Sequence, residues 1–333
     1  MRRALLWLAL LCAVLAVRPA AAQTYLVVVS GIGGEPAYQE RFLVWGSALV
    51  EAAQERLGIA ENHVAYFAED PSRDPRIRDR STKANVTAAL TDLASRAEPG
   101  AQIVVVLIGH GSTVGGEARI NLPGPDMRAE DFIPLLDAFA TQEVVFANLS
   151  SASGDWIAVL SGARRVVVTA TRSGTERDES IFGGHFVEAL TEDEADTDKD
   201  GRVSVLEAFR YANAETDRVY GQQNRLRSEH AMLDDDGDGK GSHEPDGEAG
   251  DGVRARRVFL APDPARAARA ATDDPALLAL YAERDSLEMA VTGLRARKNS
   301  MEAAAYEAEL ERMLLALART NREIREREGR EPR

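Results

Sequence analysis

Short apolar runs alternate with longer amphipathic stretches through the first two thirds of this 333-residue chain. Five of the runs are too short to span a membrane and rich in β-branched residues, which is typical of strands buried on both faces of a parallel sheet. These runs are residues 25–30, 63–68, 102–108, 143–147 and 165–171. The stretches with helical spacing are residues 38–57, 82–96, 129–139 and 155–160. The alternation predicts an α/β domain with a doubly wound, mostly parallel sheet and helices on both faces.

The composition changes after this alternating region. Acidic and glycine residues dominate at 196–207 and again at 234–252. The apolar residues 258–261 then predict a short strand that returns the chain to the sheet. Pro262 and Pro264 mark the start of a linker.

Leucines spaced seven residues apart mark the C-terminal part of the chain. The linker and the segment behind it, residues 262–333, therefore predict an amphipathic helical hairpin of coiled-coil type. Two open alternatives are packing of the hairpin on its own domain and an interface with a second copy or another protein. The residues that carry the spacing are Leu280, Leu287 and Leu294, followed by Leu310, Leu317 and Ile324.

The N-terminus has the order of a cleavable export signal. Residues 1–22 begin with two arginines, continue with an apolar run and end in three alanines. We therefore expect a mature α/β domain over residues 23–261 that is periplasmic or extracellular, without a transmembrane segment; a retained signal anchor is the alternative. The chain's one cysteine, Cys12, lies inside the signal, so the mature protein has no disulfide and no thiol nucleophile.

The net charge narrows the choice of partners. Removal of Arg2, Arg3 and Arg18 with the signal changes the formal charge from −14 to −17. An acidic surface repels phosphate backbones, and no basic stripe with interleaved aromatic residues is present. Nucleic acid is therefore not expected as a partner, whereas calcium and a basic protein surface are.

Two predicted strands end in residues that can do chemistry. The strand at 102–108 is followed by His110 and Gly111, and the strand at 143–147 is followed by a small turn with Ser151. Residues 118–122 predict a small hairpin or edge strand nearby. Catalytic groups in open α/β sheets lie outside the carboxyl ends of strands, so His110 and Ser151 are a candidate base and nucleophile. The alternative is a core histidine and a tight polar turn.

These strand ends resemble the caspase-like cysteine peptidases, most closely the legumain-type branch. The matching features are His110-Gly111-Ser112, the turn that closes with Ser153-Gly154, and an opening strand that runs into Ser30-Gly31. The resemblance implies a dyad in which His110 assists the residue at position 151, with backbone N–H groups near Gly111 holding the oxyanion.

The family has cysteine at the nucleophile position, whereas this chain has Ser151. A serine hydroxyl needs a tightly bonded, oriented base, which a thiolate does not. The main hypothesis is therefore a pseudoenzyme, a pseudopeptidase that binds peptides or protein partners without cutting them. The alternative is an active peptidase-like hydrolase that uses Ser151 and His110, and a third is a calcium-binding scaffold whose cleft has no role.

Two neighbouring positions leave alternatives open. Ser150 precedes Ser151, and either hydroxyl could face the site. Arg172 follows the strand at 165–171, where relatives build the wall of the substrate pocket, so it is a candidate partner for an acidic or carboxamide group. An exposed, solvated arginine is the other interpretation.

Residues 196–207 match the calcium loop of an EF-hand. The loop has oxygen ligands at positions 1, 3, 5, 9 and 12, a backbone carbonyl at position 7 and a glycine, Gly201, at position 6. We expect Ca²⁺ here as a structural clamp rather than a sensor. The predicted ligands are Asp196, Asp198, Asp200, Arg202, Ser204 and Glu207.

The acidic run that starts at residue 234 begins with the same rhythm. Its Asp234, Asp236 and Asp238 are candidates for a weaker second calcium site. Position 12 of this run is Pro245, so the copy of the EF-hand loop is incomplete. The alternative is a mobile loop without a metal.

Overall fold

A seven-stranded, mostly parallel sheet forms the centre of the protein. The computed structural model describes residues 23–192, 194–260, 272, 274–296 and 301–327. The strand order is β3-β2-β1-β4-β8-β9-β10, and the edge strand β10 is antiparallel to its neighbour. The strands are β1 Thr24–Ser30, β2 Val64–Ala68, β3 Ile77–Arg80, β4 Gln102–Ile108, β8 Glu143–Asn148, β9 Arg165–Thr169 and β10 Met232–Asp234.

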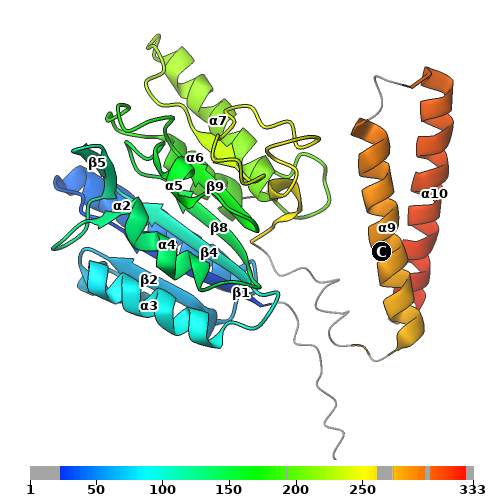
Figure 1. Cartoon of the computed structure of the whole chain (residues 1–333), viewed down its shortest axis with the longest axis horizontal. Helices are drawn as coiled ribbons and strands as arrows, with labels where there is room; N and C mark the ends of the chain where they lie inside the picture. The colour runs from blue at the N-terminus through cyan, green and yellow to red at the C-terminus, as the bar shows by residue number, and fades with distance from the viewer. Residues whose placement is uncertain (1–22, 193, 261–271, 273, 297–300, 328–333) are drawn as a thin grey trace, which may run out of the picture.

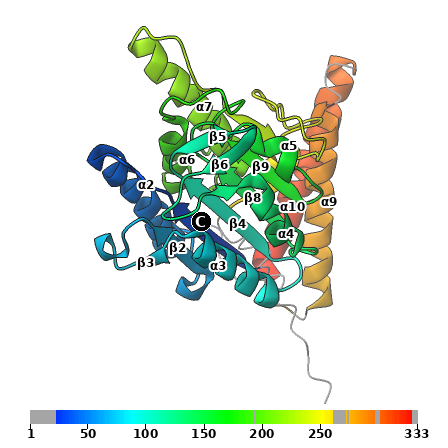
Figure 2. The same ribbon diagram turned by 60° about the vertical axis from the view of Figure 1, so that its left-hand side comes forward.

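Helices cover both faces of this sheet (Figures 1 and 2). One layer holds α2 Pro36–Glu55, α6 Phe182–Thr191 and α7 Val205–Gln222, and the other holds α3 Lys83–Arg96, α4 Ala129–Asp137 and α5 Trp156–Leu160. Alternate residues of β1 enter the two cores: Leu26 and Val28 face α2, while Val27 and Val29 face α3. Each fully buried valine or leucine contributes about 1.5–3 kcal/mol. The predicted α/β fold class is confirmed.

The topology brings the candidate residues to one edge of the sheet. The chain runs outward from β1 to β3 and then crosses back to β4, so the direction of winding changes between β1 and β4. Strands β4 and β8 are parallel neighbours, with Leu107 opposite Asn148. Because these strands are parallel, His110 and Ser151, which follow them, lie at the same carboxyl edge of the sheet.

Of the two predicted short segments, one forms a strand in the structure and the other does not. Residues 118–122 contribute β6 Glu117–Ile120, the middle strand of a separate antiparallel sheet with β5 Gly111–Val114 and β7 Met127–Arg128. The prediction that residues 258–261 return to the main sheet is wrong for the described residues of that segment. Phe259 instead forms an isolated bridge with Ser204, and Ala261 lies outside the described residues.

The sheet is completed by β10, which the apolar pattern did not reveal. Only Met232 and Leu233 are apolar there, and the acidic run starts at the third residue of the strand. Similarly, β3 has one buried residue, Ile77, because it is an edge strand with its other residues exposed. Short edge strands of this kind lack the apolar run on which sequence reasoning depends.

The C-terminal segment contains two helices, α9 Pro275–Ala296 and α10 Ala303–Arg327. They pack antiparallel, because Leu277 and Tyr281 contact Ile324 at one end, while Leu294 contacts Met313 at the other. The interface role of this hairpin stays a prediction.

The predicted signal, residues 1–22, and most of the predicted linker lie outside the described residues. Among the helices of the described residues, none is both long enough and apolar enough to cross a bilayer.

Candidate functional site at the strand ends and the acidic loops

His110 is held by helix α2 rather than by Ser151. Its ring makes edge contacts with the rings of Tyr38 and Phe42, at centroid distances of 4.6 and 5.0 Å. Burial lowers the pKa of His110 below its usual value, and a hydrogen bond with the backbone of Gly33 only partly offsets this. The imidazole is therefore neutral at pH 7, and no bond between it and the Ser151 side chain occurs among the hydrogen bonds of the described residues.

Ser151 lies at the bottom of the strand-end turn with only 3% of its surface exposed. Its Oγ accepts a hydrogen bond from the Gly111 N–H at 3.3 Å. A Cβ atom at position 111 would come within 2.1 Å of the Ser151 carbonyl oxygen, so only glycine fits there. The two strand ends thus lock onto each other, and the N–H group that could hold an oxyanion is bonded to the serine hydroxyl.

The turn around Ser151 is strained and anchored on both sides. Ala152 has a φ of +52°, a left-handed conformation that is unfavourable for a residue with a side chain. Its N–H donates to the carbonyl of Glu176 at 2.8 Å. Ser150 is fully buried, and its hydroxyl donates to Oδ1 of Asn148 at 2.7 Å. Of the two adjacent serines, Ser150 is therefore the one whose hydroxyl is hydrogen-bonded within the protein interior.

Arg172 points outward at this edge. Its side chain is 63% exposed, and its guanidinium lies 3.6 Å from the carboxylate of Glu176. The same carboxylate accepts hydrogen bonds from the backbone N–H of Arg172 and from Nδ1 of His230, at 2.9 and 2.7 Å. Arg172 thus has an acidic partner within its own chain, and its role in a substrate pocket stays a prediction.

Two cavities in the described residues are lined by residues other than the serine. One of about 420 Å³ lies at the ends of β1 and β2 and is lined by Ser30, Phe42, Glu69 and Arg80, among others. A second, of about 750 Å³, lies between α3 and the turn at 123–125. Neither cavity is lined by His110 or Ser151. Sequence reasoning missed both cavities, because their walls come from segments far apart along the chain.

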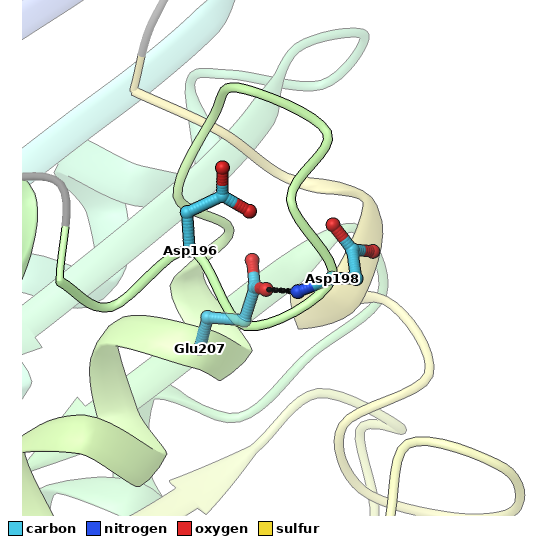
Figure 3. Close-up of side chains that lie close together, drawn as sticks. All are labelled: Asp196, Asp198 and Glu207. Atoms are coloured by element: carbon cyan, nitrogen blue, oxygen red, sulfur yellow. Dashed lines mark hydrogen bonds between the residues drawn. The ribbon is translucent and has the colours of Figure 1, made fainter.

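The loop at 196–207 gathers carboxylates around a common point. Asp196, Asp198 and Glu207 each place an oxygen within 4.8 Å of the others (Figure 3). Gly201 has a φ of +85°, as the tight turn requires. Asp200 lies outside this group and pairs with Arg202 at 3.3 Å. An all-oxygen donor set suits a hard cation such as Ca²⁺.

Glu207 joins the loop to helix α7. It is the third residue of the helix, and Ser204 is the N-cap, so the two form a reciprocal capping box. One carboxylate oxygen also accepts from the N–H groups of Thr197 and Asp198, at 3.0 and 3.3 Å. Burial alone would raise the pKa of Glu207, but the hydrogen bonds from Ser204 and Thr197 hold it below its usual value.

Asp198 has the opposite electrostatic balance. Burial raises its pKa, and the negative charges of Asp200 and Glu207 raise it further. The folded loop therefore holds like charges close together, and a bound cation would relieve their repulsion.

The second acidic run forms a different group from the predicted one. Asp234 and Asp236 come together with Asp251, whereas Asp238 lies outside the group and within 3.6 Å of Lys240. Burial raises the pKa of Asp251 to about 6, and the charge of Asp234 adds to this effect. Sequence reasoning missed Asp251 because the EF-hand spacing does not extend that far along the chain.

Comparisons with known proteins give a likeness of fold. No model of a known protein family matches this sequence, and no curated protein matches it. Among solved structures, the Drosophila initiator caspase Dronc is similar with a TM-score of 0.44 at 14% identity, over 73% of this chain and 85% of that one. A structural-genomics target protein from Geobacter sulfurreducens has a TM-score of 0.41 at 12% identity, over 58% and 89%. These likenesses concern the backbone alone, so the case for a function must come from this chain's own residues.

Proposed function

We propose that this chain is a caspase-like pseudopeptidase, close to the legumain-type branch, that binds a peptide or protein segment at the edge of its sheet without cutting it. The observation that carries the proposal is the state of Ser151: it is 3% exposed, and its hydroxyl is bonded to the Gly111 N–H. A serine nucleophile needs a hydrogen-bonded base that is itself oriented by a third group. His110 is bonded to Gly33 and packed on Tyr38 instead.

The second candidate is an active hydrolase, and the shared strand edge favours it. Gly111 directs its N–H toward Ser151, which is where an oxyanion donor would be needed. The lowered pKa of His110 also leaves the ring neutral, as a general base requires. Activity would then depend on a rearrangement that brings the His110 ring to the Ser151 hydroxyl.

Turnover of peptides by three proteins separates the candidates. The parent, Ser151→Ala and Ser151→Cys would each be incubated with a peptide library and calcium, and products would be counted by mass spectrometry. A pseudopeptidase gives no products from the parent or from Ser151→Ala. Products from Ser151→Cys alone would indicate an intact site that lacks its thiol. Parent activity that disappears in Ser151→Ala would establish the hydrolase.

We also propose that Ca²⁺ binds the loop at 196–207 and fixes it to the α/β domain. Asp196, Asp198 and Glu207 would supply carboxylate oxygens, and Asp200, Ser204 and the Arg202 carbonyl would complete the loop's donor set. The support is the all-oxygen group within 4.8 Å and the raised pKa of Asp198. Asp234 and Asp236, with Asp251, are a weaker second candidate.

Calcium titration by calorimetry tests this part of the proposal. We expect heat from the parent and a loss of the tighter binding event in Asp196→Ala and in Glu207→Ala. No heat from the parent would remove the calcium claim. The variant Asp251→Asn should affect only a second, weaker event.

Export is the last part of the proposal. Cleavage after residue 22 would release a chain that begins at Gln23. N-terminal sequencing of the protein secreted by an export-competent host tests the position, and an intact N-terminus would favour the retained anchor.

A further inference from the structure

The connection between β9 and α6 crosses the edge where Ser151 and His110 lie. We call residues 172–180 the strap. The strap starts at the end of β9, next to the turn that carries Ser151. There the Thr171 hydroxyl accepts hydrogen bonds from the N–H groups of Ser153 and Gly154, at 2.8 and 3.0 Å. A Cβ atom at Gly154 would lie 2.0 Å from the Arg172 backbone, so the strap packs directly on this turn.

The middle of the strap contacts both sides of the Ser151 turn. The Gly174 N–H donates to the Asp155 carboxylate at 3.1 Å, and a Cβ atom at Gly174 would lie 2.2 Å from Oγ1 of Thr113 on β5. The Glu176 carbonyl accepts from the N–H of Ala152, the residue after Ser151. The strap therefore touches β5, which begins at Gly111, as well as the turn that follows β8.

The far end of the strap is tied to helix α2. Glu179 accepts a hydrogen bond from the Tyr38 hydroxyl at 3.2 Å and forms an ion pair with Arg41. Tyr38 is one of the two aromatic residues that hold the His110 ring. From β9 to α2, the strap thus passes across the ends of β8 and β4, which carry Ser151 and His110.

The strap has only polar side chains and glycine. Its nine residues, Arg-Ser-Gly-Thr-Glu-Arg-Asp-Glu-Ser, include no aliphatic or aromatic side chain. The segments that flank it are firmly anchored, because Ala170 and Phe182 are both fully buried. Segments without buried apolar contacts open locally at a small fraction of the cost of global unfolding. The strap can therefore lift while the sheet and α6 stay folded.

The carboxylate of Glu176 ties the strap to a residue outside it, His230. Glu176 accepts hydrogen bonds from the backbone N–H and from Nδ1 of His230, at 3.0 and 2.7 Å. His230 lies two residues before β10, the edge strand of the sheet. The Ser180 hydroxyl, at the end of the strap, donates to the Glu229 carboxylate. Glu176 and Glu179 are thus the two acidic side chains of the strap that hold it to the rest of the domain.

From these contacts we infer that the strap is an autoinhibitory cover. The contacts that Glu176 and Glu179 make with the rest of the domain must break before a peptide can reach Ser151 and His110. The inference rests on the proposed function, in that it describes how the same site is regulated. It predicts that access to position 151 is limited by opening of the strap.

A single thiol at position 151 measures that access directly. Cys12 is the chain's one cysteine, so Ser151→Cys in a full-length Cys12→Ala background carries one thiol, within the covered site. Its rate of reaction with Ellman's reagent in native buffer and in denaturant gives the degree of cover. We expect the native rate to be lower by about 100-fold or more, as for a group that reacts only after local opening.

We call Glu176 and Glu179 the latch residues, and variants at these two positions test the strap itself. Adding Glu176→Ala and Glu179→Ala to the single-thiol protein should raise the native rate by about tenfold or more. Circular dichroism must show an unchanged fold, and exchange of the Ala152 amide should quicken in parallel. Asp92→Ala is the matched control, because it removes an ion pair with Arg96 on α3, away from the strap.

Two results would overturn the inference: a native rate equal to that in denaturant, or latch variants that react no faster than the Asp92→Ala control. The test uses no peptide. The inference about the strap can therefore be wrong while the proposal of peptide binding holds. Equally, peptide binding can be absent while the strap is shown to open.

Discussion

The strand-end edge and the loop at 196–207 treat their polar groups in opposite ways. At the edge, Ser151 and His110 are both satisfied inside the protein, by Gly111 and by Gly33. In the loop, the carboxylates of Asp196 and Asp198 lie close to that of Glu207. Polar groups whose hydrogen bonds are already made inside the protein are not available to a ligand until those bonds break. Carboxylates held close together repel one another and favour a bound cation. From this comparison we expect a cation to stabilise the loop and a rearrangement to be required before the edge is exposed.

We expect calcium to have the largest effect on stability, because the loop at 196–207 is the proposed calcium site. A cation that binds only the folded state at about 1,000 times its Kd adds about 4 kcal/mol to the free energy of unfolding. Urea unfolding with calcium and with a chelator measures the gain. We expect Glu207→Ala to abolish most of it. An equal gain in that variant would place the calcium elsewhere.

A side chain added at the strand-end edge should also destabilise the protein. In Gly111→Ala the new methyl group would overlap the Ser151 carbonyl, which is backbone and cannot rotate away. We expect a loss of about 1–3 kcal/mol, as for overpacked sites. Gly221→Ala on α7 is the matched control, since nothing lies within 4 Å of its Cβ position. If both variants are equally stable, the close approach of the two strand ends is wrong.

Protonation of His110 provides a pH test of the edge. Burial lowers the pKa of His110, so the unfolded chain takes up a proton at a higher pH than the folded protein does. The contribution of this group to stability is therefore complete above about pH 6.5 and is lost as the pH falls toward the folded pKa. NMR titration of the ring protons should show a midpoint below 6.5. A midpoint above 6.5 would mean that the ring is not held as described.

The smallest change is expected from the serine itself. Its Oγ accepts one bond of 3.3 Å from the Gly111 N–H and donates a long one of 3.5 Å to the Gly111 carbonyl, so Ser151→Ala should cost about 1 kcal/mol or less. Thermal unfolding of the variant beside Ser150→Ala measures this. The Ser150→Ala variant should lose more stability, because the Ser150 hydroxyl bonds to Asn148 in the interior. The reverse order would contradict the assignment of the two hydroxyls.

The parts of the fold that sequence could predict are those with long apolar runs. The observed β4 has the predicted bounds, residues 102–108, and its residues after Gln102 are fully buried. The edge strands β3 and β10 escaped because they bury few side chains. Apolar residues near 258 gave a false strand, since burial there comes from packing on α7 and its loop rather than from the sheet.

The candidate sites were predictable to the extent that they are local in sequence. Glu207 follows from the twelve-residue spacing of its loop, and the structure brings it to Asp196 and Asp198. Asp251 and the latch residues Glu176 and Glu179 depend on contacts between distant segments. Such contacts leave no periodic signal in one sequence, so they appear only when the fold is known.

Simultaneous binding and cleavage assays on one peptide test the central claim most directly. A fluorescent peptide selected from a library for binding to the calcium-loaded protein would be followed by anisotropy and by mass spectrometry, with the parent and with Ser151→Ala. We predict equal Kd values for the two proteins and an intact peptide after prolonged incubation. Cleavage of the peptide by the parent but not by Ser151→Ala would contradict the account.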